Sequence, residues 1–86
     1  MPRISAFYGI VIYMYIRVHG PPHVHAWAAE HRAVVDIGTG TITFGSLAAR
    51  HAGLVRDWVE LHRAELLEAW QRASMGDTPG TIDPLP

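Results

Sequence analysis

Residues 20–29 are Gly20-Pro21-Pro22-His23-Val24-His25-Ala26-Trp27-Ala28-Ala29. A glycine followed by two prolines is typical of a turn, and the residues after it alternate between small apolar side chains and large polar or aromatic ones. Successive side chains of a strand point to opposite faces of a sheet. The segment therefore predicts a strand over residues 23–29 that presents His23, His25 and Trp27 on one face and apolar side chains on the other.

The flanking segments extend this pattern into a sheet. Residues 7–17 are rich in aromatic and β-branched side chains and lead into the proline turn, which predicts one long strand. Residues 32–37 predict the next strand, and Gly38-Thr39-Gly40 predicts a tight turn into a short strand over residues 41–44. We expect one face to be apolar, with Tyr8, Ile10, Ile12, Met14, Ile16, Val24, Ala26, Ala28, Ala33, Val35, Ile37, Ile42 and Phe44. Four consecutive strands predict an antiparallel meander.

The C-terminal half of the chain has the spacing of a helix that could cover this face. Ser46 can cap a first turn over residues 47–50, Gly53 can bend or break the helix, and residues 54–73 form the main element. At helical spacing one arc is apolar, with Leu54, Val55, Trp58, Val59, Leu66, Ala69, Trp70 and Ala73. The sequence thus predicts an α+β fold in which a C-terminal helix lies across one face of the sheet.

The predicted domain covers residues 1–75, and residues 76–86 are expected to form a loosely ordered tail because they hold three prolines and two glycines without periodicity. His62 lies in the middle of the apolar helical arc, and we interpret it as a core histidine. In this topology the sheet itself separates His62 from His25.

Composition limits the classes of function. The chain of 86 residues has no cysteine, so it can form neither a disulfide framework nor a thiolate metal site. Its net charge of −1 excludes a broad positive surface that tracks a phosphate backbone, so any contact with nucleic acid would be local. The apolar run within residues 7–16 is too short to span a bilayer. We expect a cytoplasmic protein with no membrane partner.

Strand alignment places specific partners beside His25. The expected turns put Tyr15 opposite His25 on one side and Asp36 opposite it on the other, and a shift by one residue would move the apolar side chains off their common face. A hydrogen bond from His25 to Asp36 would raise the pKa of the imidazole. We therefore predict His25 as an acid/base group, oriented by Asp36 and assisted by Tyr15.

The residues around this row suggest what it could bind. We expect an anionic group such as phosphate to contact His23, Arg17 and Arg32, and a nucleobase or a partner protein to stack on Trp27 and Tyr13. No cofactor is predicted.

Other interpretations of the same residues stay open. His23 and His25 could be ordinary strand residues on a solvated face, or they could bind a metal if His19 or Asp36 supplied a third ligand. Three large rings on an open face also favour a partner surface or a homodimer.

Five segments carry a resemblance to a known family. They are Met1-Pro2-Arg3-Ile4-Ser5, Phe7-Tyr8-Gly9-Ile10-Val11-Ile12-Tyr13-Met14-Tyr15, Pro21-Pro22-His23-Val24-His25, Ala33-Val34-Val35-Asp36-Ile37 and Trp58-Val59-Glu60-Leu61-His62-Arg63-Ala64-Glu65-Leu66-Leu67-Glu68-Ala69-Trp70. In this order they resemble the bacterial family known as domain of unknown function 4160, over nearly the whole chain.

The resemblance implies a bacterial cytoplasmic protein that is the toxin of a type II toxin–antitoxin module and is neutralised by a small antitoxin protein. Such toxins are frequently ribonucleases or translation inhibitors. The family supplies no catalytic residue. The combined hypothesis is a metal-independent endoribonuclease that acts on RNA through the exposed sheet face. The alternative is a non-enzymatic interaction module, a homodimer, or the partner half of such a pair.

Overall fold

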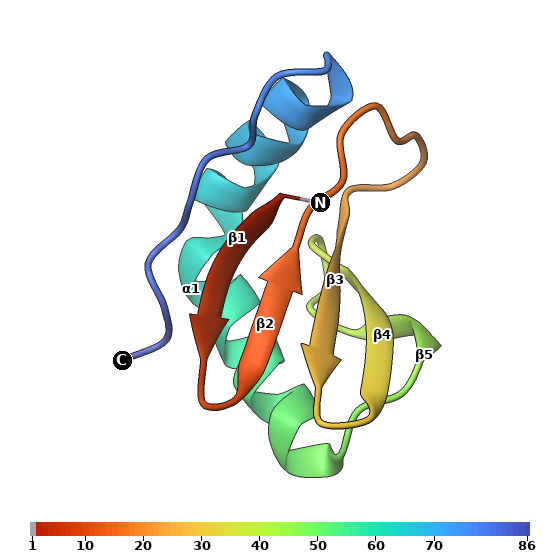
Figure 1. Ribbon diagram of the computed structural model, residues 1–86, viewed down its shortest axis with the longest axis vertical. Helices are drawn as coiled ribbons and strands as arrows, with labels where there is room; N and C mark the ends of the chain where they lie inside the picture. Colours follow the sequence, from red (N-terminus) through yellow and green to blue (C-terminus); the bar gives the residue numbers. More distant parts are fainter. Residues whose placement is uncertain (1) are drawn as a thin grey trace.

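The computed structural model describes residues 2–86, which form a five-stranded antiparallel sheet followed by one long helix (Figure 1). The elements are β1 (Arg3–Phe7), β2 (Ile10–Tyr13), β3 (His23–Ala28), β4 (His31–Asp36), β5 (Ile42–Gly45) and α1 (Ala49–Ser74). Each strand pairs with the next one along the chain, so the spatial order is β1-β2-β3-β4-β5. The predicted α+β meander is confirmed, but with five strands instead of four.

The additional strand comes from the N-terminal segment. The prediction of one strand over residues 7–17 is wrong, because Phe7 pairs with Ile10 across a two-residue turn. Tyr8 and Gly9 have φ angles of 50° and 79°, and a type I′ hairpin turn requires positive φ at both central positions. The chain therefore reverses at Tyr8-Gly9, and β1 becomes an edge of the sheet.

The alternation of faces is confirmed in the inner strands. The side chains of Ile10, Ile12, Val24, Ala26 and Val35 are at most 1% exposed and belong to one core. The side chains at the alternate positions of the same strands, such as His25, Trp27 and Val34, point to the other face and are only half-buried. The strands thus place one set of side chains in the packed layer and leave the other set accessible.

Three of the expected core positions lie outside the core. Tyr8 is 52% exposed because it occupies the hairpin turn, and Ile16 is 40% exposed because β2 has already ended. Phe44 is 77% exposed, and a β-bulge explains its position. Val35 pairs with Ile42 whereas Val34 pairs with Phe44, so one extra residue is accommodated between these pairs. The bulge keeps Ile42 against the core and turns Phe44 to the open face.

Helix α1 covers the apolar face of the sheet, as predicted (Figure 1). Its buried residues are Val55, Trp58, Val59, Leu66, Ala69, Trp70 and Ala73. The expected helix start and bend are wrong. Ala48 occupies the N-cap without a side-chain hydrogen bond, so Ser46 is not the cap, and the helix is kinked at His62 (φ −113°, ψ 20°) instead of at Gly53.

Residues 76–86 form no helix or strand, and they contact the body of the protein beside β1 and α1 (Figure 1). The Ile82 amide donates to the Ile4 carbonyl at 2.8 Å, and the Trp58 indole Nε1 donates to the Asp83 carbonyl at 2.8 Å. Pro79 and Ile82 are buried. The segment thereby shields the edge strand β1 and closes the core at one side.

No helix within residues 2–86 combines the length and the apolar character needed to cross a bilayer.

Candidate functional site

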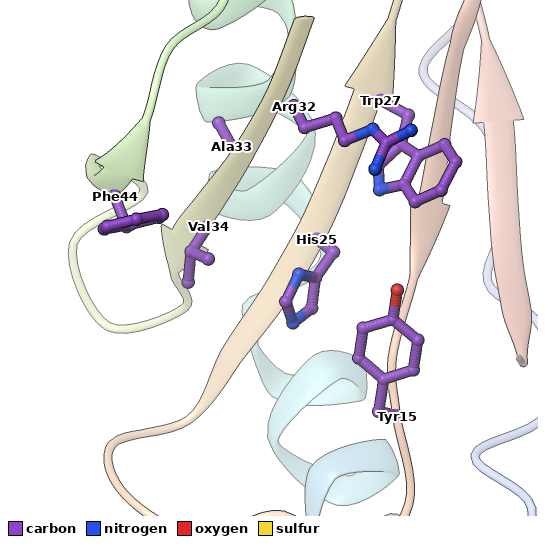
Figure 2. Close-up of a pocket in the computed structure, with 7 residues that line it drawn as sticks. All are labelled: Tyr15, His25, Trp27, Arg32, Ala33, Val34 and Phe44. Atoms are coloured by element: carbon purple, nitrogen blue, oxygen red, sulfur yellow. The ribbon is translucent and has the colours of Figure 1, made fainter.

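The open face of the sheet contains a hollow of about 250 Å³ (Figure 2). It is lined by Tyr15, His25, Trp27, Arg32, Ala33, Val34 and Phe44. Strands β3, β4 and β5 supply all of these residues except Tyr15, which lies just beyond the end of β2. The hollow therefore brings together an imidazole, a guanidinium and three aromatic rings from segments distant in sequence.

His25 lies within this group of side chains. Its ring meets the Tyr15 ring edge-on with 4.4 Å between the centroids, so the predicted proximity of Tyr15 and His25 is confirmed. The alignment of the strands, however, differs from the prediction. His25 pairs with Tyr13 on β2 and with Val34 on β4. Both alignments are shifted by two residues from the expected ones, which preserves the faces but changes every cross-strand partner.

Asp36 is the residue most affected by this shift. It pairs with His23, so the expected row that placed Asp36 opposite His25 is wrong. The carboxylate Oδ1 of Asp36 accepts a hydrogen bond from the Thr39 amide at 3.0 Å and a longer one from the Thr39 hydroxyl at 3.4 Å. Asp36 thus stabilises the turn between β4 and β5, which is a common role for an aspartate in this position.

The environment of His25 lowers its pKa below the usual value for histidine. Partial burial is the main cause, because it disfavours the charged imidazolium, and the nearby His23 adds to the effect. This is the opposite of the raised pKa expected from a bond to Asp36. At neutral pH His25 is therefore an uncharged imidazole with a lone pair available to accept a proton.

Arg32 and Trp27 form a pair on neighbouring strands. Their positions are opposite each other in the β3–β4 ladder, and the Arg32 Cζ lies 4.1 Å from the centre of the Trp27 ring. Tyr13 packs against the same indole, with 5.1 Å between the Tyr13 and Trp27 ring centroids. A guanidinium stacked on a ring keeps its N–H groups in its own plane, where they can bind a phosphate or carboxylate.

Arg17 does not join this site. It lies in the loop between β2 and β3, where its amide donates to the Ala73 carbonyl at 2.8 Å. Its side chain packs closely against Gly76. A larger residue at position 76 would displace it, because the added Cβ would lie 2.7 Å from the Arg17 Nε. The guanidinium is therefore placed beside the end of α1, where the helix dipole favours a positive charge. The expected placement of Arg17 at the border of the His25 site is therefore wrong.

His23 lies beside His25 at the start of β3. The two ring centroids are 5.3 Å apart, and the His23 ring is also 4.9 Å from that of Trp70. The His23 Nδ1 lies 3.0 Å from the Pro21 carbonyl oxygen. His23 is thus held from two sides, by the proline turn and by the helix.

Three residues that line the hollow were not predicted as site residues, namely Ala33, which was expected on the apolar face, Val34 and Phe44. Val34 and Phe44 extend it toward β5. The alternation of β4 places Val34 on the open face, so its contribution could have been found from the sequence. Phe44 could not, because the bulge that turns it outward leaves no signal in a four-residue strand.

The other histidines do not extend the site. Within residues 2–86, no group of three or more His, Cys, Asp or Glu side chains is placed to hold a metal ion. His62 lies on α1, 5.8 Å from the Trp58 ring, and its Nδ1 is 2.8 Å from the Glu65 Oε1. As expected, it belongs to the helical layer and not to the open face.

Comparison with protein families gives one match. The model described as domain of unknown function (DUF4160) matches residues 9–71. The chain belongs to the DUF4160 family. No curated protein and no solved structure matches it.

The matched DUF4160 region contains β2 to β5 and most of α1. Every residue that lines the hollow lies within it, whereas β1 and the C-terminal segment lie outside. Those two outer segments contact each other through Ile4 and Ile82. In this chain they complete the core around the matched DUF4160 region.

Proposed function

We propose that this DUF4160 protein is the toxin component of a bacterial toxin–antitoxin module and that it cleaves RNA at the open face of its sheet. The observation that carries the proposal is the hollow itself, in which a neutral imidazole, a guanidinium and flat aromatic rings line one surface. RNA offers a hydroxyl to deprotonate, a phosphate to bind and bases to stack, which matches these three kinds of group.

His25 is the general base in this proposal. Its imidazole is uncharged at neutral pH because its pKa is lowered, so it can take the proton of a ribose 2′-hydroxyl. Arg32 offsets the negative charge that develops on the phosphate. The Trp27 ring stacks against the guanidinium and holds it in place. The exposed ring of Phe44 provides a surface on which a base can stack.

The dimensions and the charge favour a short single-stranded segment as substrate. A volume of about 250 Å³ is below the roughly 300–1,000 Å³ of pockets that enclose a drug-sized ligand, so the hollow would hold one nucleotide unit. The net charge of −1 is poorly suited to a long duplex, whose binding relies on many phosphate contacts.

Expression in a bacterial host tests this function. Wild type and His31→Ala should arrest growth and fragment cellular RNA, whereas His25→Ala should do neither. His31 is the matched control because it is an exposed histidine at the start of β4 that does not line the hollow. Equal growth arrest by all three proteins, or intact RNA in arrested cells, would contradict the proposal.

A second candidate function is supported by one observation. Phe44 is 77% exposed next to Val34, and Trp27 and Tyr15 line the far side of the same hollow (Figure 2). An apolar surface of this kind often binds a protein partner. In that case the open face would bind a second copy or the antitoxin without chemistry. The solution masses of wild type and Trp27→Glu separate the two ideas. If the open face forms a dimer interface, wild type has the mass of a dimer and Trp27→Glu that of a monomer, because the glutamate charge would be buried in the interface.

A further inference from the structure

The proposed RNA cleavage needs a second group, because the leaving oxygen of the phosphodiester must receive a proton. The expected row supplied Asp36 and Tyr15 around His25, but Asp36 stabilises a turn instead. We infer that His23 is the general acid and that His23 and His25 act as a pair on one phosphate. This inference rests on the proposed function and deepens it.

The placement of the two rings supports the pair. His23 and His25 are two residues apart on β3, so alternation places both on the same side of the strand, with His23 at the rim where its ring also reaches Trp70 of α1. Their ring centroids are 5.3 Å apart. A proton donor and a proton acceptor each need to come within about 2.6–3.2 Å of their target atoms. Two rings at this separation can reach two oxygens of the same phosphodiester.

The proline turn fixes the tautomer of His23. The Pro21 carbonyl can only accept a hydrogen bond, so the Nδ1 that faces it at 3.0 Å carries a hydrogen. The Nε2 of His23 is then the atom at which a proton is gained or lost. Paired prolines restrict the backbone that holds this carbonyl, and the Trp70 ring packs against the imidazole at 4.9 Å. His23 is therefore oriented by a turn and a helix in the way that Asp36 was expected to orient His25.

The reaction balances with these two groups alone. His25 takes the proton of the 2′-hydroxyl while the 2′-oxygen forms a bond to phosphorus. The bond from phosphorus to the 5′-oxygen breaks, and the His23 Nε2 gives its proton to that oxygen. The products are a 2′,3′-cyclic phosphate and a 5′-hydroxyl. His25 has gained one proton and His23 has lost one, and exchange with water restores both.

Tyr15 is the competing donor, since its ring contacts His25. In Figure 2 its hydroxyl points along the strand toward Trp27 and not toward His25. This orientation suits a group that packs against the base better than one that serves the leaving oxygen. The inference therefore assigns Tyr15 no proton transfer.

A change of leaving group tests the assignment. The two substrates are a diribonucleotide, whose alkoxide leaving group needs a proton, and a ribonucleoside 3′-(4-nitrophenyl phosphate), whose phenolate leaves without one. The acid variant is His23→Asn, because an amide nitrogen can still donate to the Pro21 carbonyl while it has no proton to transfer. His25→Ala and Tyr15→Phe are measured beside it, and the circular dichroism of each variant is compared with that of wild type.

We expect His23→Asn to slow cleavage of the diribonucleotide by about 10²–10⁴-fold and to leave cleavage of the nitrophenyl ester close to wild type. His25→Ala should lose both activities, and any effect of Tyr15→Phe should be the same on both substrates. If His23→Asn slows both substrates equally, or if Tyr15→Phe shows the selective loss, His23 is not the acid although the proposed function stands. If wild type cleaves neither substrate, the proposed function fails and this inference fails with it.

Discussion

The two faces of the sheet are made by the same strands, and they differ in what their side chains contact. On the covered face, Ile10, Ile12 and Val24 are fully buried against α1. On the open face, the side chains of His25, Trp27 and Arg32 come from two adjacent strands and line one hollow. One set of alternate positions stabilises the fold, and the other set is free to bind and react. Changes to the two faces should therefore have separable effects.

The largest expected effect comes from comparing two tryptophans, Trp58 of α1 in the covered layer and Trp27 of β3 on the open face. Trp58 has no exposed surface, packs 5.3 Å from the Phe7 ring and donates to the Asp83 carbonyl. Trp58→Ala should lower the free energy of unfolding by about 3–5 kcal/mol, a large part of the roughly 4–13 kcal/mol expected for 86 residues. The half-buried Trp27 is the control, and Trp27→Ala should cost clearly less. Equal losses in urea unfolding would contradict the separation of the faces.

The second effect tests the bulge that turns Phe44 outward. Gly45 has a φ of 77°, and a Cβ there would collide with the Arg32 carbonyl oxygen. Gly9 has a similar φ of 79° with open space around it. Gly9→Ala should cost about 1–2 kcal/mol from backbone strain alone, and Gly45→Ala should cost more because β5 must also move away from β4. Urea unfolding of both variants measures the difference, and a smaller loss for Gly45→Ala would show that β5 adapts freely.

The third effect compares two neighbours on β5. Ile42 packs against the core, whereas Phe44 is largely exposed. Ile42→Ser should lower the free energy of unfolding by about 1–2 kcal/mol, and Phe44→Ser should change it by no more than about 0.5 kcal/mol. The same Phe44→Ser change should weaken binding of single-stranded RNA, which fluorescence anisotropy can measure. A destabilised Phe44→Ser protein would mean that Phe44 supports the fold.

The smallest effect is a pH dependence of stability. The pKa of His25 is lowered in the folded protein, mainly by burial, so the unfolded chain binds a proton there at a higher pH. As the pH falls below about 6.5, the unfolded state gains this proton first, and the free energy of unfolding decreases until the pH reaches the lowered pKa. His25→Asn should reduce the shift of the urea midpoint between pH 7 and pH 5. An unchanged shift would contradict the burial of His25.

Much of the fold could be predicted from the sequence because alternation is a strong signal. A shift by one residue would have placed Val24 and Val35 on the solvated face, so the faces of β3 and β4 were well determined. A shift by two residues leaves the faces unchanged, and alternation cannot detect it. This is why His25 was expected opposite Asp36 and pairs with Val34 instead.

The turns that set these alignments carried weak signals. The chain turns between β3 and β4 at Ala29 and Glu30, and Ala29 has a φ of 54°. This conformation is unusual for residues other than glycine, asparagine and aspartate, so nothing in the sequence pointed to it. Gly9 was a genuine signal for the first hairpin, but the aromatic and β-branched residues on both sides of it favoured one continuous strand. The contents of the candidate site were therefore easier to predict than its pairwise geometry.

The proposed cleavage requires that RNA binds at the hollow on the open face. Titration of the isotope-labelled protein with a short single-stranded RNA, followed by amide and side-chain NMR shifts, tests it most directly. We expect the shifted resonances to cluster at His25, Trp27, Arg32 and Phe44, with the outer surface of α1 unaffected. Shifts confined to α1, or no shifts at a concentration of RNA that saturates cleavage, would contradict it.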